Sequence, residues 1–137
     1  KYGPPTFYAR RCSGRSVIYM HREILGLVPG DKRQGDHISR ECLDNQKSNL
    51  RIATKSENGA NLKTNHGSSK YKGVSWDKSR GKWRATIKKY KKQIHIGYFD
   101  SGVEAARAYD EAAVEIFGAF ARPNLLDRSR EHAIYRK

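Results

Sequence analysis

Two oxygen ligands and one imidazole occur at a spacing that suits hydrolysis of a phosphodiester. Asp36 is followed directly by His37, Asn49 lies twelve positions later, and Asn58 lies nine positions after that. Carboxylate and amide oxygens are ligands for hard divalent cations, and an imidazole that titrates near neutrality can deprotonate a water. We therefore predict that Asp36 and Asn58 hold Mg²⁺ or Mn²⁺ and that His37 is the general base.

The elements around these residues would bring them together in about 30 residues. His37-Ile38 and Leu50–Ile52 have the pattern of two short strands on either side of a polar loop. Thr54, with Glu57 three positions later, predicts a capping box that starts a helix carrying Asn58. Because neighbouring side chains of a strand point to opposite faces, we expect His37 to point away from Asp36.

Composition indicates a polyanionic partner. Lys and Arg number 28 against 14 for Asp and Glu, which gives a net charge of +14 in 137 residues. A small domain needs a net charge of only roughly 2–8 for solubility, so nucleic acid is the stronger interpretation. No apolar run approaches the roughly 18 residues of a membrane span, and no secretion signal is recognisable. We expect a cytoplasmic protein with no membrane partner.

The second half of the chain has a different pattern. Three strands are predicted at Tyr71–Trp76, Lys82–Lys88 and Gln93–Phe99, and a helix at Ser101–Phe117 with a stop at Gly118. Alternation along the strands turns one set of side chains towards the helix: Trp83, Ala85, Ile87, Ile94 and Ile96. The opposite set forms a polar outer face: Arg84, Thr86, Lys88, Gln93 and His95.

These patterns predict an α+β protein of two modules. The first covers residues 1–66, with its core motif at 35–63, and a polar linker at 67–70 follows. The second covers residues 71–126, as a three-stranded antiparallel sheet packed on one α-helix. A charged tail occupies residues 127–137.

The first module resembles the HNH endonucleases, in the His-Asn-Asn form of phage and intron homing endonucleases. The resemblance rests on four stretches: Asp36-His37, Leu43–Asn45, Ser48–Arg51 and Ser56–Asn58. It implies a ββα-metal (His-Me finger) fold in which His37 is the general base. It further implies that Asn49 fixes the loop carrying the base, and that Asn58 binds the metal beside Asp36.

The second module is similar to the APETALA-type, or ethylene-response-factor, DNA-binding domain of plant transcription factors. The matching stretches are Tyr71–Val74, Gly81–Trp83, Ile96–Asp100 and Glu104–Ala113. This similarity implies a sheet that enters the major groove, and such domains also occur fused to HNH nucleases of mobile elements. The positions that it implies face DNA are Lys72, Ser75, Thr86, Lys88, Gln93 and His95, and the alternation of the second strand adds Arg84.

Together these observations predict a metal-dependent endonuclease that nicks one strand of double-stranded DNA per active site, as a monomer or a dimer. The alternative is a non-enzymatic DNA-binding regulator that keeps a relic of the nuclease fold. A third possibility, an RNA-binding module, requires aromatic side chains on the exposed sheet face. The predicted outer face lacks them, which disfavours that reading.

Overall fold

The computed structural model describes residues 6–62 and 68–125, and the chain divides into two compact units. The first unit is Lys1–Asn58 and the second is Gly59–Lys137. The division falls inside a helix, a few residues before the linker expected from the sequence, so the predicted domain bounds stay a prediction. The predicted tail at 127–137, and residue 67 of the predicted linker, lie outside the described residues.

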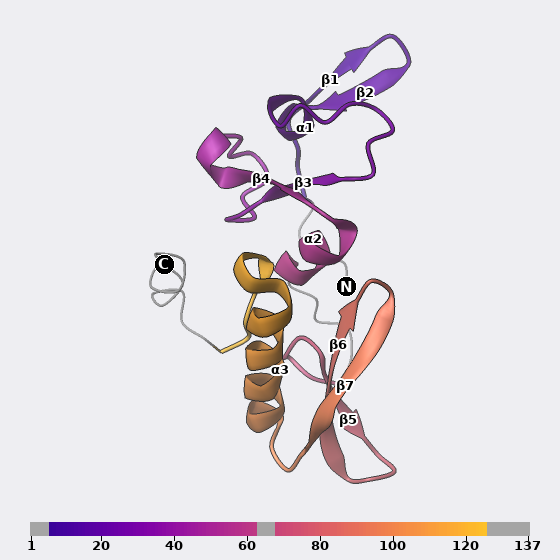
Figure 1. The fold of residues 1–137 in the computed structure, drawn as a ribbon, viewed down its shortest axis with the longest axis vertical. Helices are drawn as coiled ribbons and strands as arrows, with labels where there is room; N and C mark the ends of the chain where they lie inside the picture. The colour runs from indigo at the N-terminus through magenta and orange to yellow at the C-terminus, as the bar shows by residue number, and fades with distance from the viewer. Residues whose placement is uncertain (1–5, 63–67, 126–137) are drawn as a thin grey trace. The chain divides into compact units, whose positions relative to one another are not determined.

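The first unit is a small β/α region (Figure 1). β1 (Arg10–Ser13) and β2 (Ser16–Tyr19) form an antiparallel hairpin that leads into α1 (Met20–Ile24). β3 (Gln34–His37) pairs antiparallel with β4 (Leu50–Ala53), and a short 3-10 helix at Lys47–Asn49 precedes β4. The strand pair predicted on either side of the polar loop is therefore present.

The helix α2 (Lys55–Asn61) starts at the capping box that the sequence predicts. The Thr54 amide donates to Glu57 Oε2 at 2.7 Å, and the Glu57 amide donates to Thr54 Oγ1 at 3.2 Å. Each side chain thus satisfies an amide that the first helical turn leaves without a partner. This box sets the first residue of α2 and therefore the position of Asn58 on the helix.

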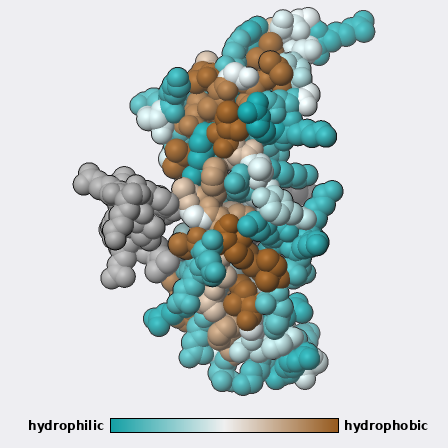
Figure 2. Space-filling view, in the orientation of Figure 1, coloured by the Kyte–Doolittle hydropathy of each residue, from teal (hydrophilic) through white to brown (hydrophobic). Residues whose placement is uncertain are grey.

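The second unit is a three-stranded antiparallel sheet packed on one helix, as predicted. β5 (Val74–Asp77), β6 (Lys82–Lys89) and β7 (Lys92–Phe99) lie in sequence order, and α3 (Gly102–Phe117) covers one face. A single 3-10 turn at Gly118–Phe120 follows α3. In Figure 2, hydrophobic atoms lie in the middle of this unit's visible face with hydrophilic atoms on both sides. The buried contacts are mainly small and aromatic: Val74, Ala85, Ile87, Ala105, Ala106, Tyr109, Ala113 and Phe117.

Both ends of α3 follow from the sequence. Ser101 is the N-cap and accepts a hydrogen bond from the Val103 amide, and Gly118 ends the helix with a φ of 51°. Alanines on the buried side let the helix approach the sheet closely, which is why Ala105 and Ala106 are fully buried. Within the described ranges, no helix is long and apolar enough to cross a membrane.

A buried carboxylate links the end of the second unit to its beginning. Asp110 on α3 is 1% exposed and accepts hydrogen bonds from the amides of Asn124 and Leu125 at 2.6 and 2.7 Å. The Asn124 side chain in turn accepts from the Lys72 amide at 2.7 Å and donates to its carbonyl at 3.1 Å. Because these bonds satisfy the buried charge, the segment after α3 is tied to the residues that precede β5.

Candidate functional site

Asp36 lies at the end of β3 with an arginine beside its carboxylate. Its side chain is almost fully buried, and Arg51 Nε donates to Asp36 Oδ2 at 2.7 Å. The pairing register causes this contact, because Asp36 on β3 lies directly opposite Arg51 on β4. Sequence reasoning missed Arg51 as a site residue, although it belongs to the Ser48–Arg51 stretch that matches the HNH motif.

Asn58 approaches the same face of β3 from the helix. Its Nδ2 donates to Gln34 Oε1 at 2.6 Å, a bond that does not involve Oδ1. Gln34 and Asp36 are two positions apart on the strand, so they share a face and their Cα atoms are about 7 Å apart. The structure therefore brings Asp36 and Asn58 to one face of β3, with Gln34 as a neighbour that the sequence did not single out.

His37 occupies the opposite face of β3 and is 5% exposed. Its Nε2 lies 3.2 Å from Asn45 Oδ1, and the Asn45 amide group donates to the Leu43 carbonyl at 3.2 Å. The contact with Leu43 orients the Asn45 side chain so that its oxygen faces the imidazole. Asn45 is thus a second residue of the matching motif to which sequence reasoning gave no role.

Aromatic rings enclose His37 on its inner side. The His21 ring lies 5.0 Å from the His37 ring, and the Tyr8 ring lies 6.2 Å from it, between centroids. Gly35 leaves room for this packing, because a Cβ there would lie 2.6 Å from His21 Cδ2. Burial, followed by the nearby His37 and Arg22, lowers the pKa of His21, while burial and a hydrogen bond with Cys42 raise the pKa of Tyr8 to about 12.

Asn49, at the end of the loop between β3 and β4, makes hydrogen bonds across that loop. Its Oδ1 accepts from the Ser39 amide and its Nδ2 donates to the Asp44 carbonyl, each at 2.9 Å. Its backbone carbonyl also accepts from the Ile38 amide at 2.9 Å. Three bonds from one residue therefore span the loop that begins directly after His37.

The oxygen donors at β3 fit a magnesium-like cation. Among residues 6–62 and 68–125, no group of three or more His, Cys, Asp and Glu side chains is arranged to hold a metal. One carboxylate and one amide are a smaller set of hard oxygen ligands, and Mg²⁺ accepts such a set because it keeps several waters. The donor chemistry of Asp36 and Asn58 therefore suits Mg²⁺ or Mn²⁺.

The outer face of the second unit's sheet carries the polar set expected from alternation. Arg84, Thr86 and Lys88 lie on the face of β6 opposite the buried Ala85 and Ile87. Across the strands, Gln93 Nε2 donates to Thr86 Oγ1 at 3.1 Å, and His95 pairs with Thr86. Arg84 Nε is buried and, within the described part of the chain, has no hydrogen-bond partner.

This face also holds an aromatic ring, which corrects the expectation that it lacks one. The register between β6 and β7 shifts at Ala85/Thr86, so Tyr98 pairs with Arg84 on the outer face. Its ring lies 4.6 Å from the His95 ring, and the Arg80 guanidinium lies 4.8 Å above it. The period-two pattern of the sequence does not reveal this bulge. The expected lack of aromatic side chains on the outer face therefore no longer argues against an RNA-binding module.

The remaining two residues expected to face DNA differ in their surroundings. Ser75 on β5 pairs with Arg84 and belongs to the outer face. The Lys72 ammonium instead donates to the carbonyls of Gly59 and Leu62, at 3.3 and 2.9 Å. Burial lowers the pKa of Lys72 to about 8. A role for Lys72 in DNA binding stays a prediction.

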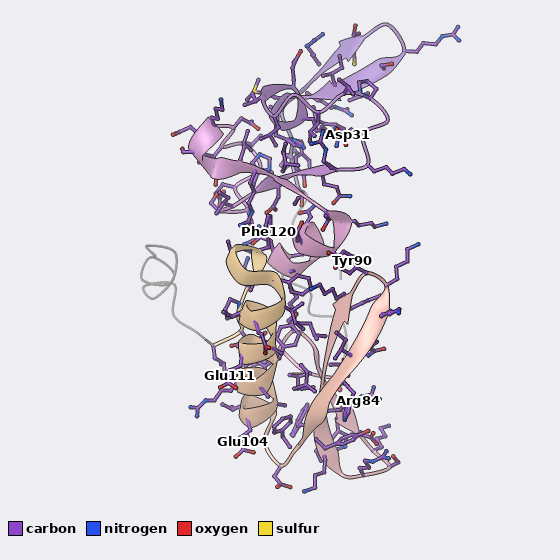
Figure 3. The ribbon with its side chains drawn as sticks, in the orientation of Figure 1. Asp31, Arg84, Tyr90, Glu104, Glu111 and Phe120 are labelled. Atoms are coloured by element: carbon purple, nitrogen blue, oxygen red, sulfur yellow. The ribbon has the colours of Figure 1, made fainter. Side chains whose placement is uncertain are left out.

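The two sides of the second unit differ in their charged residues. Glu104 and Glu111 lie on the side of α3 away from the sheet, whereas Arg84 lies on the sheet (Figure 3). Between Asp77 and Asp100 the sequence contains no acidic residue. The sheet is therefore expected to attract a polyanion more strongly than the outer side of α3, where exposed Arg107 lies between the two glutamates.

Comparison with known proteins assigns a family resemblance to each half of the chain. A model of the AP2 domain matches residues 69–119. APETALA2-like protein 2 of rice (Oryza sativa subsp. indica) is 48% identical over 60 residues, which cover 42% of this chain and 14% of the rice protein.

Two viral proteins extend the similarity beyond the AP2 match. A protein of Acanthamoeba polyphaga mimivirus, named as an uncharacterized HNH endonuclease, is 38% identical over 104 residues, which cover 76% of this chain and 53% of that protein. Protein 3.8 of Escherichia phage T7 is 38% identical over 88 residues, which cover 64% of this chain and 72% of that protein. The chain thus spans about half the length of the mimivirus relative.

Proposed function

This chain belongs to the proteins in which an HNH endonuclease region is fused to an AP2 domain, and on that premise we propose that it is a metal-dependent DNA endonuclease of the homing type. We assign hydrolysis of the phosphodiester to residues 1–66 and anchoring on duplex DNA to residues 71–126. The first unit's β/α elements would then form a ββα-metal (His-Me finger) centre.

One observation carries the proposal: β3 presents different chemistry on its two faces. Asp36 and Asn58 approach one face, whereas His37 lies on the other and is held by Asn45. A nuclease needs these two functions on either side of the scissile phosphate, with oxygen ligands on one side and a base for the water on the other.

The surroundings of His37 suggest which nitrogen is the base. The Asn45 amide group is oriented by the Leu43 carbonyl, so its Oδ1 faces the ring and accepts a hydrogen bond from Nε2–H. That tautomer makes Nδ1 the basic nitrogen, which takes the proton of the attacking water. Asn49 would keep this geometry by closing the loop after the base.

Asp36 and Asn58 would hold Mg²⁺ or Mn²⁺ through a carboxylate and an amide oxygen. When bound, the cation supplies positive charge that stabilises the phosphate and the leaving oxygen. Arg51 keeps the Asp36 carboxylate oriented through its bond to Oδ2. Gln34 orients Asn58 in the same way through Nδ2, and this leaves the amide oxygen for the cation.

The sheet of the second unit would anchor the enzyme in the major groove. Arg84 lies on the outer face between Ser75 and Tyr98, and its guanidinium could donate to a guanine edge or a phosphate. The neighbouring outer-face residues would contribute further contacts: Ser75, Thr86, Lys88, Gln93 and His95. The DNA sequence that the domain recognises would depend on these side chains. Lys72, which is also predicted to face DNA, would contribute at the edge of this face.

Nicking of supercoiled plasmid tests the nuclease function. We expect Mg²⁺ or Mn²⁺ to support nicking and EDTA to abolish it. His37→Ala should lower the rate at least about 100-fold, since a positioned general base contributes about 10²–10⁴. Asn45→Ala should also lower the rate, by less, while leaving the affinity for DNA unchanged.

Two controls keep the result interpretable. Arg107→Gln alters an exposed α3 residue outside both sites and should nick at the wild-type rate. Binding of a duplex by the His37→Ala variant should equal that of the wild type. If the wild type binds duplex DNA but leaves plasmid supercoiled with every divalent metal tested, the chain is a non-enzymatic DNA-binding regulator instead.

A further inference from the structure

The turn between β6 and β7 has a backbone conformation that its residues disfavour. Tyr90 and Lys91 are the two residues between the strands, and their φ angles are 48° and 67°. A two-residue hairpin loop with both φ values positive is a type I′ turn, for which Asn-Gly is the usual sequence. Side chains with a Cβ are strained in this region, so retaining Tyr-Lys here requires another reason.

The chemistry of this tip, Lys89–Lys92, suits a polyanion. It contains three lysines around Tyr90, whose side chain is 66% exposed. Lys89 lies 5.6 Å from the Tyr90 ring and donates to the Ile116 carbonyl at 3.4 Å, so it is partly engaged. Lys91 and Lys92 are exposed. A basic tip with a solvent-exposed ring has no role in the core of the unit.

The tip lies at the end of the sheet, one position beyond Lys88 and Gln93, which are the last pair of the outer face. Thr86, at the middle of that face, lies four residues before Tyr90, a distance of about 13 Å along the strand. The major groove is about 12 Å wide. When Thr86 and Arg84 are inside the groove, the tip therefore lies at its flank, beside the sugar-phosphate backbone.

We propose that the tip Lys89–Lys92 is a second DNA contact, which grips the sugar-phosphate backbone at the flank of the groove. Lys91 and Lys92 pair with phosphates, and the Tyr90 ring lies against the adjoining sugars. This inference rests on the proposed function of the sheet as a duplex-binding face. It adds a contact that is independent of sequence, because phosphates and sugars carry no direct sequence information.

Three variants of the full chain test the tip, with affinity for a mixed-sequence duplex measured between about 50 and 200 mM salt. Lys92→Gln leaves the turn residues intact. It should lower the affinity and reduce the slope of log affinity against log salt by about 0.9, the value for one lost phosphate contact. Replacing Tyr90 with Asn and Lys91 with Gly supplies the preferred turn sequence, so Tm of the second unit should rise by about 4 °C or more. The same double variant should bind about tenfold more weakly.

The matched control is Arg107→Gln, which removes one exposed positive charge from α3 and should change neither the affinity nor the slope. The inference is overturned if the double variant is more stable and binds within about twofold of the wild type with an unchanged slope. Should the double variant not fold, the slope of Lys92→Gln decides alone. A wild-type chain that binds no duplex would instead overturn the proposed function, and this inference with it.

Discussion

Asp36 and His37 are neighbours in the chain but lie in different electrostatic surroundings. The Asp36 carboxylate has the Arg51 guanidinium 2.7 Å away, whereas His37 is bordered by the rings of His21 and Tyr8. The difference arises from strand geometry alone, since consecutive side chains of β3 leave on opposite faces. A carboxylate that binds a metal and an imidazole that acts as a base can therefore be adjacent in the chain without pairing with each other.

Burial of His21 should make the first unit sensitive to acid. The pKa of His21 is lowered in the folded chain, chiefly by burial, so between this value and its unfolded value near 6.5 the unfolded chain binds more protons. Stability is then complete above about pH 6.5 and is lost as the pH falls through this window. We expect urea unfolding of the first unit, followed by its amide signals in NMR spectra, to show lower stability at acidic pH.

An NMR titration of the His21 ring protons checks the cause directly. Its midpoint should lie below that of an unstructured histidine, and His21→Gln should remove this part of the acid sensitivity. A midpoint at or above the unstructured value would contradict the assignment to burial. The same titration does not depend on nuclease activity, so it reports on the packing of His21 even in the absence of metal.

At the scale of elements, the parts that local chemistry determines were predictable from the sequence. The Thr54–Glu57 box, the Ser101 N-cap and the Gly118 stop are all present. Each involves residues two or three positions apart or a single backbone angle, so one stretch of sequence contains all the information. The strand pairs and the polar outer face follow for the same reason from period-two alternation.

Features that depend on register or on distant partners were not predictable. Arg51 meets Asp36 because β3 and β4 pair in one of several possible registers. Tyr98 reaches the outer face because of a bulge, and a sequence pattern does not reveal a bulge. The Lys72 ammonium donates to backbone carbonyls ten or more residues away in the chain, and composition alone does not distinguish such bonds from contact with DNA.

Gly73 is the glycine on which the second unit depends most. Its φ is 74°, and a Cβ there would lie 2.2 Å from the Tyr109 ring and 2.6 Å from the Thr86 carbonyl oxygen. Gly73→Ala should therefore cost about 3 kcal/mol or more of the free energy of unfolding, from overpacking added to the unfavourable φ. Urea unfolding of the second unit measures this cost.

Gly81 provides a matched control within the same unit. Its φ is 61°, but nothing lies within 4 Å of the position of a Cβ. Gly81→Ala should therefore cost only about 1 kcal/mol, the penalty for the left-handed conformation itself. Equal costs for the two substitutions would show that the Tyr109 ring moves aside, and would remove the steric part of the argument.

Over the whole molecule, charge and chemistry are divided between the two units. The net charge of +14 includes a stretch from residue 78 to residue 99 without a single acidic residue, on the sheet of the second unit. The candidate base and metal ligands all lie in the first unit. Under the proposed function, binding and hydrolysis are therefore separable, so we predict that variants of the sheet change affinity, whereas variants of β3 change the rate on bound DNA.

The number of candidate centres predicts the products of cleavage. The described residues contain one pair of oxygen ligands and one base of this kind, at β3. Because the two strands of duplex DNA run in opposite directions, one asymmetric centre fits one scissile phosphate at a time. A double-strand cut requires a second binding event or a second copy of the chain, related by a two-fold axis.

A time course with supercoiled plasmid distinguishes these routes. At low protein concentration, nicked circles should form first, at a rate proportional to the amount of protein, and linear DNA should appear only after a lag. If the chain dimerises on DNA, the linear fraction should rise with the square of protein concentration, and sedimentation of the complex should show two copies. Linear DNA that appears without a lag, at concentrations where sedimentation shows a single copy per duplex, would contradict a single centre per chain.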